Sequence, residues 1–103
     1  MFRRTRFGDL IARQLDLFER DRAGLLHDVD AAERAYTEAA RDEAEERYGE
    51  YVDLVETATE ALADLRDHFA STLGEDEAER YVAEFNRGVR KRLPRFGLEI
   101  DLR

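Results

Sequence analysis

The chain of 103 residues contains no cysteine and no tryptophan, and it has a single proline, Pro94. Without cysteine, it can form neither disulfide bonds nor thiolate zinc sites, and it has no thiol nucleophile. The six glycines are scattered, so no glycine-rich phosphate-binding loop is present. Ser71 is the only serine, and no nucleophile-turn motif surrounds it. We therefore predict that the protein is not an enzyme and has no catalytic residue and no cofactor.

Histidine is also scarce, with only His27 and His68 in the chain. A di-iron site in a helical bundle uses Glu-x-x-His pairs, but the residue three positions before His68 is Leu65. An acidic residue adjoins each histidine, as chance provides in a chain with 25 acidic residues. We therefore expect no metal site.

No long uncharged apolar run occurs anywhere in the chain. The basic start, MFRRTRF, is followed by no such run, so we expect neither a signal peptide nor a membrane span. The net charge of −8 disfavours nonspecific binding to nucleic acid or to an anionic membrane. Sixteen arginines stand against one lysine, Lys91, which is typical of a GC-rich genome. The predicted location is the cytoplasm of a bacterium.

Apolar residues make up 43% of the chain and charged residues 41%, whereas soluble domains carry about 25% charged residues. Such a chain has narrow apolar faces and broad solvated ones. Its length fits one domain, so we treat 1–103 as a single helical domain. The fold class that we predict is all-α, an elongated three-helix bundle that resembles a coiled coil.

Two of the three helices are short and flank a longer one. Apolar residues at three- and four-residue intervals predict a first helix over residues 7–22, followed by a turn at about 23–27 where Gly24 suits the left-handed conformation. A third helix over 75–92 has acidic residues in its first turn and Arg90, Lys91 and Arg92 in its last, and Pro94 follows it.

Between them, one continuous central helix is predicted over about 28–73. This stretch has no proline and one glycine, and its two apolar runs differ in phase by one residue, which is typical of a stutter in a long helix. The alternative is an antiparallel hairpin with a turn near 41–50. Acidic residues Glu43, Glu45 and Glu46 would then fall in the last turn of the first arm, where the helix dipole disfavours them.

A continuous helix of this length would extend about 69 Å. The two short helices cannot cover all of its apolar side, so we predict self-association, most simply as a homodimer or a higher homo-oligomer. The acidic middle and the basic termini would favour an antiparallel arrangement. The predicted self-association residues are Tyr36, Tyr48, Tyr51, Val55, Leu62 and Phe69.

The last residues, 94–103, form a predicted extended tail in which apolar and charged residues alternate with the period of a strand. The tail could pair with the N-terminal MFRRTRF, dock as a strand on another protein, or fold back over the bundle; we favour the first and third readings. The candidate docking residues are Phe96, Leu98, Ile100 and Leu102.

A second candidate site is basic. Arginine and lysine cluster without intervening acids near the end of the third helix, and they could bind an anion or nucleic acid. The same cations also suit a helix C-terminus, and we do not expect nucleic acid to be the partner. The predicted function is a non-catalytic, self-associating interaction or scaffold protein, and the alternative is an anion- or nucleic-acid-binding accessory protein. The candidate anion-binding residues are Arg87, Arg90, Lys91, Arg92 and Arg95.

Overall fold

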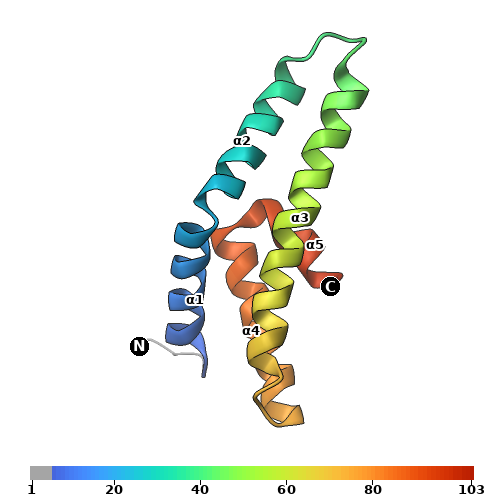
Figure 1. Ribbon diagram of the computed structural model, residues 1–103. Helices are drawn as coiled ribbons and strands as arrows, with labels where there is room; N and C mark the ends of the chain where they lie inside the picture. Colours follow the sequence, from blue (N-terminus) through green and yellow to red (C-terminus); the bar gives the residue numbers. More distant parts are fainter. Residues whose placement is uncertain (1–5) are drawn as a thin grey trace.

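The computed structural model describes residues 6–103, and within that range the protein is entirely helical, without strands (Figure 1). The predicted all-α class is therefore confirmed. None of the helices in this range is long and apolar enough to cross a membrane. The elements in chain order are α1 (Gly8–Asp21), α2 (Ala23–Glu38), α3 (Ala44–Ala70), α4 (Glu75–Arg92), a 3-10 turn η1 (Pro94–Phe96) and α5 (Gly97–Asp101).

Helices α1 and α2 follow each other with only a bend at Arg22. The first helix lies where the apolar periodicity predicts it, and its residues Ile11, Leu15 and Phe18 are buried. The predicted turn at 23–27 is wrong, because α2 already begins at Ala23. Gly24 lies within this helix and does not adopt a positive φ.

The continuous helix predicted over 28–73 is corrected to two antiparallel helices. Helix α2 ends at Glu38, Ala39 has extended backbone angles, and residues 39–43 connect to α3, which retains 27 residues. The phase shift between the two apolar runs is therefore a chain reversal. The connection lies slightly before the predicted alternative turn, and this places Glu45 and Glu46 in the first turn of α3, where the helix dipole favours acids.

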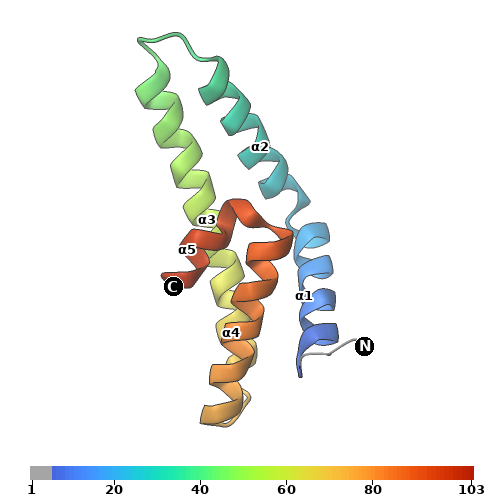
Figure 2. The same cartoon turned by 180° about the vertical axis from the view of Figure 1, so that it is seen from behind.

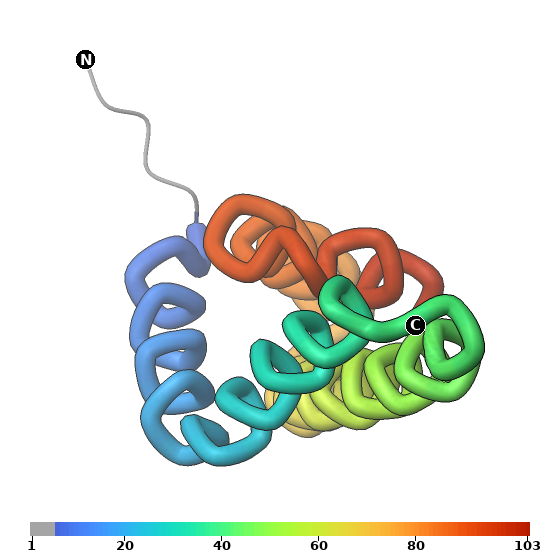
Figure 3. Tube along the Cα trace, turned by 90° about the horizontal axis from the view of Figure 1, so that it is seen from above, coloured from blue at the N-terminus to red at the C-terminus, as the bar shows by residue number. Residues whose placement is uncertain are grey.

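Helix α4 begins and ends at the predicted residues. Its first turn contains three acids and its last turn three cations, so both ends complement the helix dipole. Helix α4 packs against both α1 and α3, and its residues Tyr81, Phe85 and Val89 are fully buried. Seen from above, α1 and α3 lie apart from each other, with α4 alongside both (Figure 3).

The extended tail predicted over 94–103 is wrong. After Pro94 the chain forms η1 and then the short helix α5, which packs against α3 and α4. Phe96 and Ile100 are four residues apart and buried on one side, whereas Leu98 and Leu102 are four apart and exposed on the other. In so short a segment, the same apolar residues fit both the two-residue period of a strand and the four-residue spacing of a helix. The strand prediction was therefore wrong. The favoured expectation that the tail folds back on its own bundle is correct for Phe96 and Ile100. Pairing with MFRRTRF falls outside the described residues, since 1–5 are not among them.

Two glycines allow close packing around α4. A Cβ atom on Gly88 would lie 3.1 Å from Cγ2 of Ile11, so glycine permits α1 to approach α4. A Cβ atom on Gly97 would lie 3.1 Å from Cγ and 3.3 Å from Cα of Arg90, so glycine also permits the start of α5 to rest on α4. Both contacts bring a terminal segment of the chain against the same helix.

The molecule is elongated, with extents of 50 × 29 × 23 Å. Its body consists of α1, α4, α5 and the C-terminal half of α3, and the outer parts of α2 and α3 project from it as a two-helix arm (Figures 1 and 2). The arm ends in the connection 39–43, and we call this connection together with the adjoining helix ends, residues 36–48, the arm tip.

Candidate interaction site

Three of the five predicted anion-binding cations form ion pairs within the chain. The guanidinium of Arg90 lies 2.7 Å from a carboxylate oxygen of Asp101, which ties α4 to α5. Arg92 pairs with Asp16 and lies 2.8 Å from Glu19, both in α1. The structure therefore uses Arg90 and Arg92 to hold terminal segments on the bundle.

Arg95 is the third paired cation, and it joins η1 to the base of the arm. Its guanidinium donates hydrogen bonds to Asp30 at 2.5 Å and to Glu33 at 2.9 Å, both in α2. The hydrogen bond from Arg95 holds the pKa of Asp30 below its usual value, and the same bond raises the pKa of Arg95. The hydroxyl of Tyr51 in α3 donates to Glu33 at 3.4 Å, and burial raises the pKa of this tyrosine.

The remaining two cations, Arg87 and Lys91, are exposed, and neither forms an ion pair within residues 6–103. They border a groove between α1 and α4 with a volume of about 300 Å³. Its floor includes Ile11, Leu15 and the bare backbone of Gly88. We call this the α1/α4 groove. It combines an apolar floor with two cations that form no ion pair within the described residues and with one acid, Glu84.

A pair of tyrosines lies near the arm tip. The rings of Tyr36 in α2 and Tyr48 in α3 have centroids 5.0 Å apart, and the residues are 38% and 50% exposed. Together with Ala44 and Glu45 they line a shallow depression of about 270 Å³. An aromatic pair is thus left in solvent, in the most acidic part of the chain.

The other predicted self-association residues are covered by the chain itself. Val55 and Leu62 are buried in the core, and the ring of Phe69 packs 4.8 Å from that of Tyr81. Tyr51 is half-buried beside Glu33. Of the six residues, only Tyr36 and Tyr48 are exposed, because α2, α4, η1 and α5 pack along the rest of the apolar side of α3.

The predicted docking residues of the tail divide between two environments. Phe96 and Ile100 are buried, whereas Leu98 and Leu102 are each 76% exposed. The two leucines are four residues apart on one side of α5, and Leu98 lines a shallow depression together with Arg90, Pro94 and Asp101. Only this leucine pair is accessible to a partner.

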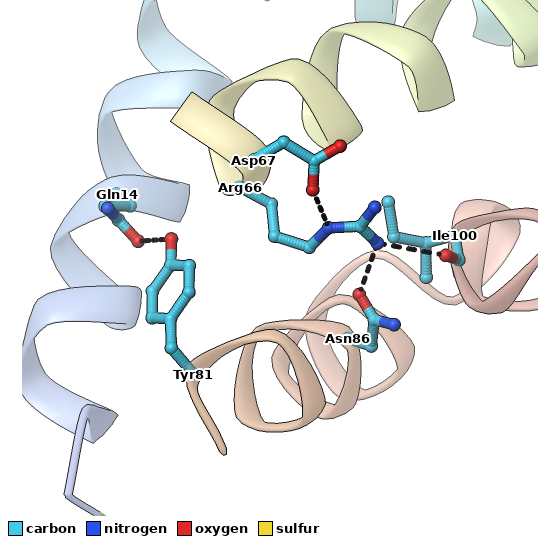
Figure 4. Close-up of polar contacts among 6 residues, drawn as sticks. All are labelled: Gln14, Arg66, Asp67, Tyr81, Asn86 and Ile100. Atoms are coloured by element: carbon cyan, nitrogen blue, oxygen red, sulfur yellow. Dashed lines mark hydrogen bonds and ion pairs between the residues drawn. The ribbon is translucent and has the colours of Figure 1, made fainter. Parts of the chain in front are cut away.

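Sequence reasoning missed one polar cluster, which surrounds Arg66 in α3 (Figure 4). Arg66 is 3% exposed; its Nε donates to Asp67 at 2.8 Å, and one terminal nitrogen donates to Asn86 at 3.0 Å and to the carbonyl of Ile100 at 3.2 Å. A signal was present in the sequence, since Arg66 lies four residues after Leu62 and so falls on the inner face of the helix.

A second polar contact in the core joins α4 to α1. The hydroxyl of Tyr81 donates to Oε1 of Gln14 at 2.7 Å (Figure 4). Burial raises the pKa of Tyr81 to about 12. No buried side-chain nitrogen or oxygen among residues 6–103 is without a hydrogen-bond partner.

The two histidines lie in separate depressions. His27 lines one of about 650 Å³ beside Arg92 and Arg95, and His68 lines one of about 410 Å³ between α1 and α3. Within residues 6–103, no three acidic or histidine side chains are placed to hold a metal ion together. Comparisons with models of known families, with curated proteins and with solved structures gave no match.

Proposed function

We propose that the protein is a non-catalytic helical interaction protein that associates with itself. The observation that carries this proposal is where its exposed apolar side chains lie. Among residues 6–103, four of the five exposed large apolar side chains gather in pairs, Tyr36 with Tyr48 near the arm tip and Leu98 with Leu102 at α5, and the fifth, Leu17 in α1, is 41% exposed. Grouped apolar side chains on a surface are typical of interaction sites, whereas single ones are common on any protein.

The arm supports the proposal of self-association. Its outer part consists of two helices with no third helix beside it (Figures 1 and 2). Two helices cover each other on one side only, and a second copy would supply two more. Most soluble oligomers are built from identical copies, and dimers with two-fold symmetry are the commonest among them. The proposed setting is the cytoplasm of a bacterium, on the composition alone.

The alternative, an anion- or nucleic-acid-binding protein, has less support. Of the five candidate cations, Arg90, Arg92 and Arg95 are paired with acids of the same chain. Only Arg87 and Lys91 stay available among them. Phosphate-backbone binding in nucleic-acid proteins commonly uses more cations than two.

Molar mass by light scattering over a wide range of protein concentration tests the proposal. We expect a mass of two chains at high concentration that falls toward one on dilution. The double variant Leu98→Ser/Leu102→Ser tests the leucine pair independently of the tyrosine pair. It changes only the two exposed leucines and leaves the buried Phe96 and Ile100 in place. A single-chain mass at every concentration would overturn self-association.

A further inference from the structure

The proposed self-association does not say which surfaces of the two copies meet. The following inference rests on that proposed function and names these surfaces. We infer that the α1/α4 groove of one chain receives the arm tip of a second copy, in an antiparallel dimer with two-fold symmetry. The tyrosine pair of one copy would lie over the apolar floor of the groove, and tip acids would lie beside Arg87 and Lys91.

Charge complementarity selects this occupant. The groove presents Arg87 and Lys91, which form no ion pair within residues 6–103, and one acid, Glu84, whose carboxylate accepts a hydrogen bond from the backbone N–H of Phe7. The neighbouring cations Arg90 and Arg92 are neutralised internally. The arm tip has the opposite net charge, with five exposed acids against the two cations Arg41 and Arg47; the acids are Glu38, Asp42, Glu43, Glu45 and Glu46. Two arm tips would repel each other, whereas a tip and a groove attract.

The shape and the apolar character of the two surfaces also favour contact between the arm tip and the α1/α4 groove. The groove has an apolar floor made by Ile11 and Leu15, and Gly88 contributes no side chain to fill it. The tip offers aromatic rings that are already partly exposed, Tyr36 and Tyr48. Aromatic side chains are the commonest anchors of protein interfaces, and they bury a large area while ordering few rotatable bonds.

The tyrosine pair lies on the side of the arm that faces η1. Arg95 of η1 reaches Glu33 in α2, and the hydroxyl of Tyr51 in α3 reaches the same carboxylate. Tyr36 lies three residues after Glu33 in α2, and Tyr48 lies three residues before Tyr51 in α3. Each tyrosine is therefore on the same helix face as that contact, about one turn nearer the arm tip.

The two helices that border the groove, α1 and α4, lie toward this same side of the molecule (Figure 2). Helices α4 and α5 and the turn η1 lie in front of α3 in Figure 2, with α1 beside α4. Arg92 lines both the α1/α4 groove and the depression that contains Arg95.

The length of the molecule allows both contacts at once. The arm tip lies at one end of a molecule that is 50 Å long, and α1 and α4 lie toward the other end (Figure 2). When two copies lie antiparallel with these sides facing, each tip lies over the groove of the other copy. The two-fold axis repeats the contact, so the assembly closes as a dimer and does not continue as a fibre.

Charge reversal with restoration tests the inference. The groove variant Arg87→Glu/Lys91→Glu and the tip variant Asp42→Lys/Glu45→Lys should each dissociate at least about tenfold more readily than the original chain, because like charges then meet. An equimolar mixture of the two variants should form a mixed dimer, since both of its contacts then join opposite charges: the two reversed surfaces meet in one contact and the two original surfaces in the other. Sedimentation with one variant labelled measures the mixed species.

The matched control is Arg13→Glu/Arg80→Glu, which changes the net charge as the groove variant does but at exposed positions that do not line the groove. It should leave the dimer constant within about twofold, because dispersed surface charges are screened by salt. Circular dichroism and thermal unfolding check that each variant folds. If charge reversal unfolds the chain, the neutral variants Arg87→Gln/Lys91→Gln and Tyr48→Ser replace it, and each should still weaken the dimer.

The outcomes separate this inference from the proposed function. A dimer that both reversals weaken and the mixture restores supports tip-to-groove docking. A dimer that the groove variant leaves unchanged, or that the mixture fails to restore, overturns the docking while self-association stands, and the leucine pair of α5 becomes its site. An original chain that is monomeric throughout overturns both, and the groove is then free for an acidic segment of another protein.

Discussion

The guanidinium of Arg66 donates a hydrogen bond of 3.2 Å to the backbone carbonyl of Ile100, which lies 34 residues further along the chain. The carbonyl belongs to the last turn of α5 and also accepts a hydrogen bond from the backbone N–H of Arg103 at 3.2 Å. A buried charge of α3 therefore adds a second donor at the end of the C-terminal helix. The same terminal nitrogen also reaches Asn86, so three helices meet at one side chain.

Replacing Arg66 by alanine should strongly destabilise the fold. The change removes one donor from the Ile100 carbonyl and one from Asn86, and removal of one partner from a buried charged network costs about 3 kcal/mol. Urea unfolding followed by circular dichroism measures the loss. The control is Arg47→Ala, whose ion pair with Glu50 is exposed and screened by water, so its loss should change stability far less. Equal stability of the two variants would contradict a structural role for Arg66.

Truncating a side chain on the buried side of α5 should lower stability much more than truncating one on the exposed side. Ile100→Ala removes a fully buried side chain and should lower the free energy of unfolding by about 2–5 kcal/mol. Leu102→Ala alters a residue that is 76% exposed, so the change should stay within about 0.5 kcal/mol. Thermal unfolding of both variants measures the contrast. Similar effects at both positions would mean that α5 is not packed as described.

The reversal at the arm tip can be tested with proline. Ala39 has the extended backbone angles that a residue before proline requires, so Ala40→Pro should change stability by less than about 1 kcal/mol. In a continuous helix the same proline would cost about 3 kcal/mol or more. Ala58→Pro, in the buried middle of α3, is the control that should unfold the protein. Loss of helicity in both variants by circular dichroism would contradict the hairpin.

Tyr81 should make stability fall at alkaline pH. Burial raises its pKa from 10.0 to about 12, so its contribution is fully present below pH 10 and is lost as the pH rises through about 12. Tyr81→Phe should cost about 1 kcal/mol at neutral pH, through the lost hydrogen bond to Gln14, but should lack this alkaline loss. The free energy of unfolding of both chains, followed from neutral pH to pH 12, tests this. If the free energy of unfolding of the two chains fell in parallel as the pH rises, burial would not raise the pKa of the Tyr81 phenol.

The boundaries of α1 and α4 could be predicted because local signals agree there. In α4, acids at the start, cations at the end, apolar spacing and the following Pro94 all favour one answer. The reversal at residues 39–43 could not be predicted in the same way, because Ala39 and Ala40 are good helix formers and no glycine or proline interrupts the chain there. Packing of α2 against α3 outweighs that local preference.

The sequence by itself determined the helical class, two of the helices and the separation of acidic and basic segments, since these depend on residues near one another in the chain. Tertiary structure decided which charges are available and which apolar residues are covered. Arg90, Arg92 and Arg95 find partners 11, 73 and 62 residues away, whereas Arg87 and Lys91 have none within residues 6–103. Sequence spacing cannot distinguish these cations, because their pairing depends on how α1, α2 and α5 pack around α4 and η1.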